Sequence, residues 1–318
     1  MKKQKLGNSN IEITKIGFGA WAIGGPGYAF GWGRQDDNDS IEAIHKALEL
    51  GVNWIDTAAV YGTGHSEKIV AEALKQWQDE KPYIFTKCSL VWDEKRNISN
   101  SYKPESIRNE CENSLKRLKV DAIDLYQMHW PPPNDDSLID PAWEAMAKLK
   151  EDGKVKWIGI SNFNVKQMKQ AEKIAPVTSF QPPYSMLHRN VEKEILPYCR
   201  NQNIGVIVYS PMASGMLTGS MTLERIKNFP DNDWRKGSPD FTEPKLSRNL
   251  QIVEKLKEIG KKYNRNPGEI AVAWVLKNPA VTGAIVGARN EKQVNGVYYA
   301  SEFELDKDDI EEIEELTG

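Results

Sequence analysis

Short apolar runs alternate along the chain with segments in which apolar residues recur at helical spacing. Three of the runs follow a glycine of the kind that ends a helix. The eight runs of strand length lie within 15–20, 47–56, 82–87, 122–129, 148–161, 177–182, 199–210 and 282–288. Strands that are apolar almost throughout, joined by helices, predict a parallel sheet covered by helices. Eight such repeats favour a closed (β/α)8 TIM barrel over an open doubly wound sheet.

Helical patterns fill the intervals between these strands. Residues 40–50 place their apolar side chains on one face at a period of 3.6 residues. Pro104 and Pro141 suit the first position of a helix, and they predict helices over 104–118 and 141–150. We expect a single barrel domain over residues 1–318.

Two segments fall outside the repeat. Residues 4–13 alternate polar and apolar positions around an Asn/Ser turn, which predicts an N-terminal β-hairpin at the bottom of the barrel. Residues 212–244 form a long loop after strand 7, and loops of this length in compact domains are usually functional or disordered. We therefore expect the second segment to close over a bound ligand.

Composition narrows the function classes. The chain carries 42 basic and 45 acidic residues without a basic cluster, so neither nucleic acid nor a membrane surface is an expected partner. No apolar run is long enough to span a bilayer, and the first residues lack the apolar stretch of a secretory signal. Cys88, Cys111 and Cys199 are widely spaced, which predicts reduced thiols in a cytoplasmic protein, with no disulfide and no metal site. Oligomeric state leaves no readable signal.

Four polar side chains are expected at the carboxyl ends of adjacent strands, where barrels gather functional groups. Asp56 ends the second strand, Tyr61 lies on the loop after it, Lys87 ends the third strand and His129 the fourth. Neighbouring strands lie about 4.8 Å apart, so these groups can converge on one small molecule. We expect the Lys87 ammonium to lower the pKa of Tyr61 and Asp56 to keep that lysine charged. The pattern predicts a general acid beside a carbonyl that receives a hydride, with His129 orienting the carbonyl oxygen.

Longer motifs around these residues resemble the aldo-keto reductase family. They are DTAAVYGTGHSE at 56–67, TK at 86–87, DLYQMHW at 124–130, GISNF at 159–163, Gln181, YSPMASGMLTG at 209–219 and IVGARN at 285–290. They cover nearly the whole chain in the family's order. The chain is most similar to bacterial reductases of the general-stress and inositol-locus type, with potassium-channel β subunits as more distant relatives. The resemblance implies NADPH-dependent reduction of aldehydes and ketones by a tetrad of Asp56, Tyr61, Lys87 and His129, with Tyr61 as proton donor.

The resemblance also implies where the cofactor binds. Ser161, Asn162 and Gln181 would hold the nicotinamide carboxamide, with Tyr209 stacked under the ring and Trp21 beside it. The pyrophosphate would lie against Ser210, Pro211, Met212, Ser214 and Gly215.

At the adenosine end, the resemblance assigns Gly287 and Arg289 to the phosphate and Gln293 to the adenine. A guanidinium matches a 2′-phosphate in fork geometry, which favours NADPH, with NADH as the other possibility. The chain departs from the family at Val297, where an Asn is common, and Asn295 is the nearest replacement. A second departure is the Ala213–Ser214 pair in the pyrophosphate segment.

Tryptophans on the expected strand-to-helix loops suggest a substrate pocket, with core or lid packing as the alternative. The pocket candidates are Trp21, Trp32, Trp92 and Trp130, and Trp234 lies on a loop of the same kind. Residues 17–22 match a dinucleotide fingerprint, but glycines rather than a helix follow, which disfavours a Rossmann fold. The other three histidines, His45, His65 and His188, have no mutual ligand spacing and are expected to be structural.

Two other functions remain open on the sequence alone. A cofactor-binding redox sensor, similar to the channel β subunits, would keep the same tetrad with incidental turnover. A metal-dependent barrel hydrolase would need a His-x-His motif after the first strand, and the run KIGFGA lacks it.

Overall fold

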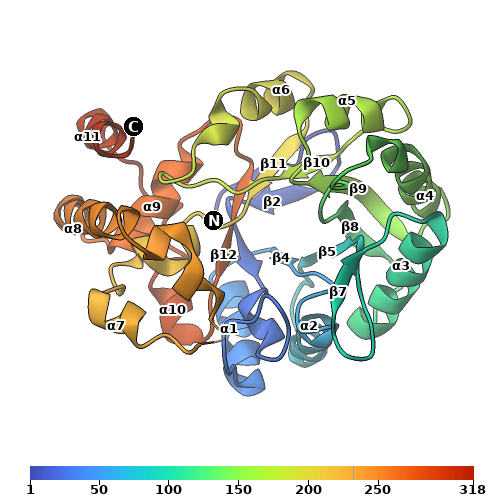
Figure 1. The fold of residues 1–318 in the computed structure, drawn as a ribbon, viewed down its shortest axis with the longest axis horizontal. Helices are drawn as coiled ribbons and strands as arrows, with labels where there is room; N and C mark the ends of the chain where they lie inside the picture. Colours follow the sequence, from blue (N-terminus) through green and yellow to red (C-terminus); the bar gives the residue numbers. More distant parts are fainter. Residues whose placement is uncertain (232) are drawn as a thin grey trace.

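The computed structural model describes residues 1–231 and 233–318. In these residues, eight parallel strands close into a barrel in the order β10-β11-β12-β3-β4-β5-β8-β9. Figure 1 shows the strands at the centre of the molecule with the helices arranged around them. The strands are β3 (Ile16–Gly19), β4 (Trp54–Asp56), β5 (Tyr83–Cys88), β8 (Ile123–Met128), β9 (Val155–Ser161), β10 (Ser179–Gln181), β11 (Gly205–Val208) and β12 (Gly283–Gly287). The predicted (β/α)8 TIM barrel is confirmed.

The helices follow the strands as the periodicity predicts. Helix α3 begins at Pro104, whereas α4 begins at Ile139, two residues before Pro141. Pro141 still lies in the first turn, where a missing backbone N–H breaks no helical hydrogen bond. The helices that pack around the barrel are α1 (Asp37–Glu49), α2 (His65–Gln76), α3 (Pro104–Leu118), α4 (Ile139–Glu151), α5 (Val165–Glu172), α6 (Ile195–Asn201), α8 (Lys245–Tyr263), α9 (Pro267–Leu276), α10 (Glu291–Asn295) and α11 (Lys307–Thr317).

The N-terminal hairpin closes the amino ends of the strands, as predicted. Strands β1 (Lys3–Lys5) and β2 (Glu12–Thr14) pair antiparallel. Leu6 and Ile13 are fully buried in one apolar cluster with Trp54 and Phe85 at the start of β4 and within β5. Burying these side chains removes apolar area from water and fixes the hairpin against the barrel floor.

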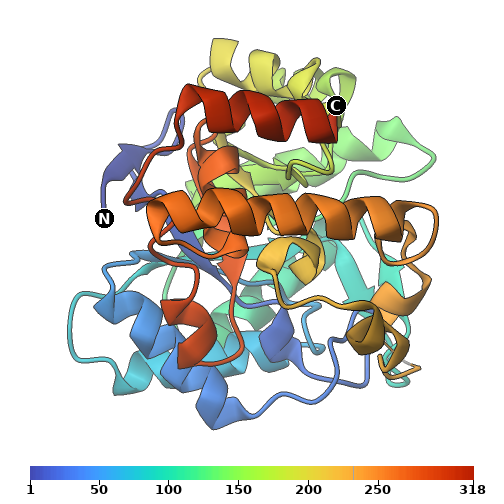
Figure 2. The ribbon, with the colours of Figure 1, turned by 90° about the vertical axis from the view of Figure 1, so that its left-hand side faces the viewer.

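The long segment after the seventh strand is also confirmed, but it is not a bare loop. It contains the 3-10 helices η4 (Ala213–Thr218), η5 (Trp234–Gly237) and η6 (Pro239–Phe241) and the short α7 (Leu223–Lys227). Asn232, which belongs to this segment, lies outside the described residues. Figure 2 shows α8 on the outside of the barrel, with α11 running alongside it.

A second, smaller insertion follows β5, where β6 (Leu90–Trp92) and β7 (Ile98–Asn100) form an antiparallel hairpin. The sequence pattern did not predict this pair. Among the helices in the described part of the chain, none is long and apolar enough to cross a membrane.

Candidate active site

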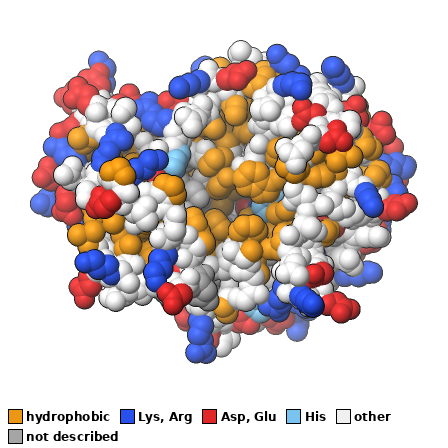
Figure 3. Space-filling view, viewed as in Figure 1, with side chains coloured by type: hydrophobic (Ala, Val, Ile, Leu, Met, Phe, Trp, Pro, Cys, Tyr) orange, Lys and Arg blue, Asp and Glu red, His pale blue; other side chains and the backbone are white. Residues whose placement is uncertain are grey.

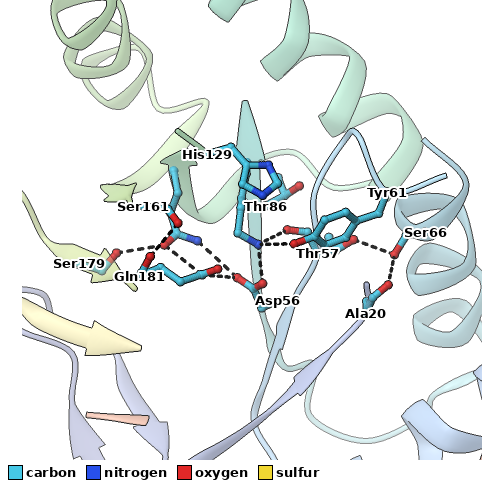
Figure 4. A network of polar contacts seen from close by, with 12 residues as sticks. Ala20, Asp56, Thr57, Tyr61, Ser66, Thr86, His129, Ser161, Ser179 and Gln181 are labelled. Atoms are coloured by element: carbon cyan, nitrogen blue, oxygen red, sulfur yellow. Dashed lines mark hydrogen bonds and ion pairs between the residues drawn. The ribbon is translucent and has the colours of Figure 1, made fainter. Parts of the chain in front are cut away.

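The four candidate catalytic side chains meet at the carboxyl end of the barrel. Lys87 Nζ lies 2.5 Å from Asp56 Oδ1, 2.9 Å from the Thr57 carbonyl oxygen and 3.4 Å from the Tyr61 hydroxyl. Asp56 ends β4 and Lys87 lies in the neighbouring β5, so parallel pairing of the two strands brings their side chains together. The structure thus brings Asp56, Tyr61 and Lys87 into one polar cluster (Figure 4).

His129 completes the group from the loop after β8. Its backbone N–H donates to the Cys88 carbonyl at 3.0 Å, which extends the pairing between β8 and β5 by one residue. Its ring packs edge-on against the Tyr61 ring, with centroids 5.7 Å apart at 76°. An imidazole in this position lies beside the phenol, where it can contact a carbonyl oxygen next to the Tyr61 hydroxyl (Figure 4).

Burial governs the protonation of these groups. It raises the pKa of Tyr61 well above its ordinary value, and the Asp56 carboxylate raises it further. Burial lowers the pKa of Lys87, and the Asp56 carboxylate opposes that change. Burial and the nearby Lys87 charge hold the pKa of His129 well below its ordinary value. The expected lowering of the Tyr61 pKa by Lys87 is therefore not what the structure gives, because burial and the Asp56 carboxylate raise that pKa.

The Asp56 carboxylate has further partners. Gln181 Nε2 donates to Asp56 Oδ2 at 2.9 Å, and Gln127 Nε2 lies 3.4 Å from the same oxygen. The Gln127 amide oxygen in turn lies 3.4 Å from Gln181 Nε2. Asp56 is therefore held from one side by the ammonium and from the other by two amides. Figure 4 shows Gln181 and Tyr61 on opposite sides of Asp56.

The residues expected to hold a nicotinamide form a connected row on neighbouring strand ends. Ser161 Oγ donates to the Gln181 carbonyl oxygen at 2.7 Å, and Asn162 Nδ2 lies 3.0 Å from Ser161 Oγ. Asn162 Nδ2 also donates to the His129 carbonyl at 3.0 Å, and Asn162 Oδ1 accepts from the Tyr209 hydroxyl at 2.9 Å. These contacts tie the row to the loop that carries His129.

The segment after β11 has an unusual backbone. Ser210, Ala213 and Ser214 have positive φ angles of 53°, 46° and 54°, and Gly215 follows at 92°. Non-glycine residues rarely adopt this conformation, and here it makes a tight turn in which the N–H groups of Ala213 and Gly215 donate to the carbonyl oxygens of Ser210 and Met212 at 2.9 Å and 3.1 Å. The turn coincides with the residues expected to contact a pyrophosphate. Pro211 is buried and Met212 half-buried in the same turn.

The residues expected at the adenosine end lie on and after β12. Gly287 is exposed at the end of the strand, and the backbone N–H of Arg289 donates to Gln293 Oε1 at 2.9 Å. The departure from the family pattern has a structural reason here. Val297 packs against the hydrophobic core, whereas Asn295 is exposed.

An aromatic stack lines the mouth above Tyr61. The Trp21 ring stacks on Tyr61 with centroids 6.2 Å apart and on Trp234 with centroids 5.9 Å apart. Trp32 meets both tryptophans edge-on, at 5.0 Å and 5.8 Å. The stack joins the loop after β3 to the segment after β11. Figure 3 shows apolar side chains gathered around the centre of this face.

The remaining pocket candidates lie outside this stack. Trp92 is part of β6, where the Arg117 guanidinium lies 5.7 Å from its ring. Trp130 follows His129 and is 45% exposed. Of the four tryptophans expected at a substrate pocket, Trp21 and Trp32 share one aromatic stack with Trp234, whereas Trp92 and Trp130 lie outside that stack.

Other sequence features have structural roles. The fingerprint at 17–22 leads into a 3-10 helix, η1 (Ala22–Gly24), and not into the α-helix that a Rossmann fold requires. His45, His65 and His188 contact the Ala73 carbonyl, Asp37 and Asp240, respectively. Within the described ranges, no three His, Cys, Asp or Glu side chains are grouped to hold a metal ion.

The model of the aldo/keto reductase family matches residues 15–317. The chain belongs to the aldo/keto reductase family. Over 315 residues it is 36% identical to the aldo-keto reductase YhdN of Bacillus subtilis (strain 168), covering 98% of this chain and 92% of that protein. Over 308 residues it is 35% identical to the NADH-specific methylglyoxal reductase of Escherichia coli (strain K12), covering 92% of this chain and 91% of that protein.

Solved structures agree with this membership. The glycerol dehydrogenase of Gluconobacter oxydans superimposes on this aldo/keto reductase with a TM-score of 0.88 at 36% identity, covering 99% of this chain and 94% of that one. The holo form of an aldo-keto reductase from Bacillus halodurans gives a TM-score of 0.82 at 26% identity, covering 99% and 96%. The family resemblance read from the motifs is confirmed. This aldo/keto reductase is a nicotinamide-dependent oxidoreductase of small carbonyl compounds.

Two polar residues near this aldo/keto reductase site were missed by the sequence reasoning. Gln127 is an amide at an inward-facing position of the apolar strand β8, on the same face as Leu125. That polar position in an apolar run is a readable signal. Gln35 contacts Arg289 from the loop before α1, and no local pattern marks it.

Proposed function

We propose that this aldo/keto reductase reduces aldehydes or ketones with NADPH and that Tyr61 donates the proton. The observation that carries the proposal is the position of the Tyr61 hydroxyl, 3.4 Å from an ammonium whose own partner, Asp56, is buried. Burial raises the pKa of Tyr61, so the phenol is protonated at neutral pH, and the adjacent Lys87 ammonium offsets part of the cost of releasing that proton.

The chain's own groups fit a nicotinamide dinucleotide. The amides of Asn162 and Gln181 and the Ser161 hydroxyl lie in a row, a suitable partner for a carboxamide. The positive-φ residues Ser210, Ala213, Ser214 and Gly215 shape a tight turn at the end of β11, against which a pyrophosphate would lie. When bound in this row, the nicotinamide would supply the hydride.

The residues around the carbonyl have distinct tasks. A neutral His129 ring, whose pKa is held low, can donate an N–H to the carbonyl oxygen and orient it. Tyr61 then passes its hydroxyl proton to the same oxygen as negative charge develops there. The phenolate that remains is stabilised by the Lys87 ammonium, since an opposite charge at this distance favours the ionised phenol. Asp56 opposes the lowering of the Lys87 pKa by burial and so favours the charged ammonium.

The preference for NADPH rests on charge at the adenosine end. Burial lowers the pKa of Arg289, and the charges of Arg235 and Arg225 lower it further, while Asp233 opposes them. Arg235 is paired with Asp233 at 2.7 Å, so the argument for a phosphate at this end rests on the Arg289 guanidinium itself. We also infer a cytoplasmic location, because Cys88, Cys111 and Cys199 are free and buried.

The test is a carbonyl panel followed at the nicotinamide absorbance with NADPH and with NADH. Methylglyoxal belongs in the panel, and so does glycerol oxidation in the reverse direction, because the named relatives act on these compounds. We expect turnover with NADPH. Tyr61→Phe should reduce the turnover rate about 10²–10⁴-fold, the usual contribution of a positioned general acid. Cofactor binding by that variant should be retained.

Undiminished turnover in Tyr61→Phe would refute Tyr61 as the acid. Tight NADPH binding without turnover on any carbonyl, together with a co-purifying partner, would favour a redox sensor instead.

A further inference from the structure

Arg289 and Gln35 join two loops that are far apart in the sequence. Arg289 Nε donates to Gln35 Oε1 at 2.6 Å, and Gln35 Nε2 donates to the Arg289 carbonyl oxygen at 2.8 Å. Arg289 Nη2 also donates to the carbonyl oxygen of Arg34. The loop before α1 therefore hydrogen-bonds with both the side chain and the backbone of Arg289.

Gln35 is itself held in one orientation. Its Nε2 lies 2.9 Å from Ser40 Oγ and 3.2 Å from the Asp36 carbonyl oxygen. Asp36 is the N-cap of α1, where its side chain accepts from the backbone of Asn38. Ser40 is buried in the first turns of the same helix. The start of α1 thus fixes the Gln35 amide, and the amide in turn fixes the guanidinium.

The remaining donors of Arg289 then face a definite direction. A guanidinium has five N–H donors. Those on Arg289 that contact the loop before α1 are the single N–H of Nε and one N–H of Nη2. The Nη1 edge has no protein partner in residues 1–231 and 233–318. Arg235, whose positive charge lowers the pKa of Arg289, belongs to the segment after β11. Arg235 is itself paired with Asp233, and the Nη1 edge of Arg289 is suited to a phosphate oxygen.

We propose that Gln35 is a specificity-determining residue, which positions the Arg289 guanidinium for the 2′-phosphate of NADPH and so sets the preference between the two cofactors. This inference rests on the proposed assignment of Arg289 to the adenosine phosphate. It adds a residue from the opposite loop, and it predicts that the preference can be changed without touching Arg289.

The competing interpretation is that the Gln35–Arg289 contact only fastens the loop before α1 to the loop after β12. The two interpretations differ in a measurable ratio. A fastening role would weaken every adenine nucleotide to the same degree. A positioning role would weaken only nucleotides that carry a 2′-phosphate.

The experiment uses adenosine 2′,5′-bisphosphate and adenosine 5′-monophosphate, titrated calorimetrically into the full chain. We expect the wild type to bind the bisphosphate about 100-fold more tightly, as for a charged forked hydrogen bond. Gln35→Ala should reduce this advantage about tenfold, because the guanidinium loses one fixed orientation. Gln35→Glu should reduce it further, since a carboxylate beside Arg289 neutralises the guanidinium and repels the phosphate.

Binding of the monophosphate should stay within about twofold in both variants. Gln78→Glu is the matched control, because Gln78 is exposed after the end of α2, where its Nε2 donates to the Gln76 carbonyl oxygen. It makes the same charge change and should leave the ratio as in the wild type. A partly unfolded variant would show a reduced calorimetric stoichiometry for both nucleotides, which distinguishes unfolding from an equal loss of affinity.

Equal loss of the two nucleotides in Gln35→Glu would overturn the proposal, and so would a wild type that binds both alike. Because the probes contain no nicotinamide, this outcome is independent of carbonyl turnover. Failure of Tyr61→Phe to lose activity would refute the proposed proton donor while leaving the nucleotide ratio intact.

Discussion

The Asp56 carboxylate and the Lys87 ammonium form a 2.5 Å ion pair in which the two side chains are only 3% and 0% exposed. A charge taken this far from water is costly unless a partner and further hydrogen bonds satisfy it. Lys87 has the Thr57 carbonyl as a second acceptor, and Asp56 has the amide of Gln181 as a second donor. The pair is therefore the centre of a satisfied polar network inside an apolar barrel.

Removing one member of this pair should destabilise the protein. Asp56→Asn leaves the Lys87 ammonium buried without a counter-charge, and we expect a loss of about 3–5 kcal/mol in the free energy of unfolding at neutral pH. Urea denaturation measures it. Asp121→Asn, at an exposed position after α3, is the control and should change stability by less than about 0.5 kcal/mol. A loss in Asp56→Asn no larger than in the control would mean that the pair is not energetically coupled to the fold.

The amide of Gln127 should matter for turnover more than for cofactor binding. Gln127→Leu removes a donor from the Asp56 carboxylate while keeping a similar volume. We expect kcat to fall only about fivefold, because the 3.4 Å contact is long for a hydrogen bond. The kcat of Gln127→Glu should be lower still, because this variant places a second carboxylate beside Asp56. Steady-state kinetics with NADPH titrations would measure both effects. A Gln127→Glu enzyme as active as Gln127→Leu would contradict this account.

The sequence predicted which residues meet at this site, whereas features that depend on tertiary packing could not be predicted from it. Asp56, Tyr61, Lys87 and His129 were found because strand ends are visible in sequence and all strand ends of a barrel meet at one face. The direction of the Tyr61 pKa was missed because burial depends on packing that no local pattern encodes. The Gln35–Arg289 contact spans the closure of the barrel, so its partners are adjacent only in the folded protein.

A buried acid away from the tetrad should make stability depend on pH. Burial raises the pKa of Glu110 from its ordinary value of 4.5 to about 7, against hydrogen bonds from Ser106 and the Ser89 backbone. Between those two values the folded protein keeps a proton that the unfolded chain releases. The stabilisation is therefore complete below the ordinary pKa and is lost as pH rises through about 7, by at most about 3 kcal/mol.

Glu110→Gln tests this dependence, because the amide resembles the protonated acid at every pH. Urea denaturation between about pH 5 and 8 should show a falling free energy of unfolding for the wild type and a flatter profile for the variant. Parallel profiles for the two proteins would assign the pH dependence to another group.

The aromatic stack should control access to the site. Trp234→Ala removes the ring that stacks on Trp21, a contact worth about 0.5–1.5 kcal/mol beyond its buried area, and so loosens the segment after β11. We expect a higher KM for the carbonyl and faster tryptic cleavage at Arg225 or Lys236. NADPH should slow that cleavage in the wild type if the segment closes over the pyrophosphate.

Trp130→Ala is the matched control, since Trp130 is exposed and outside the stack. It should leave the cleavage rate unchanged. Equal cleavage of the wild type with and without NADPH would argue against closure of this segment.

The hairpin of β1 and β2 has a consequence for the order of events. Leu6 and Ile13 pack across the amino end of the barrel and close it. Cofactor and substrate must therefore both enter and leave at the carboxyl end. A dinucleotide seated against the amides of Asn162 and Gln181 would lie deeper than the carbonyl that follows it. The dinucleotide would then bind before the carbonyl compound, and the alcohol product would dissociate before the dinucleotide.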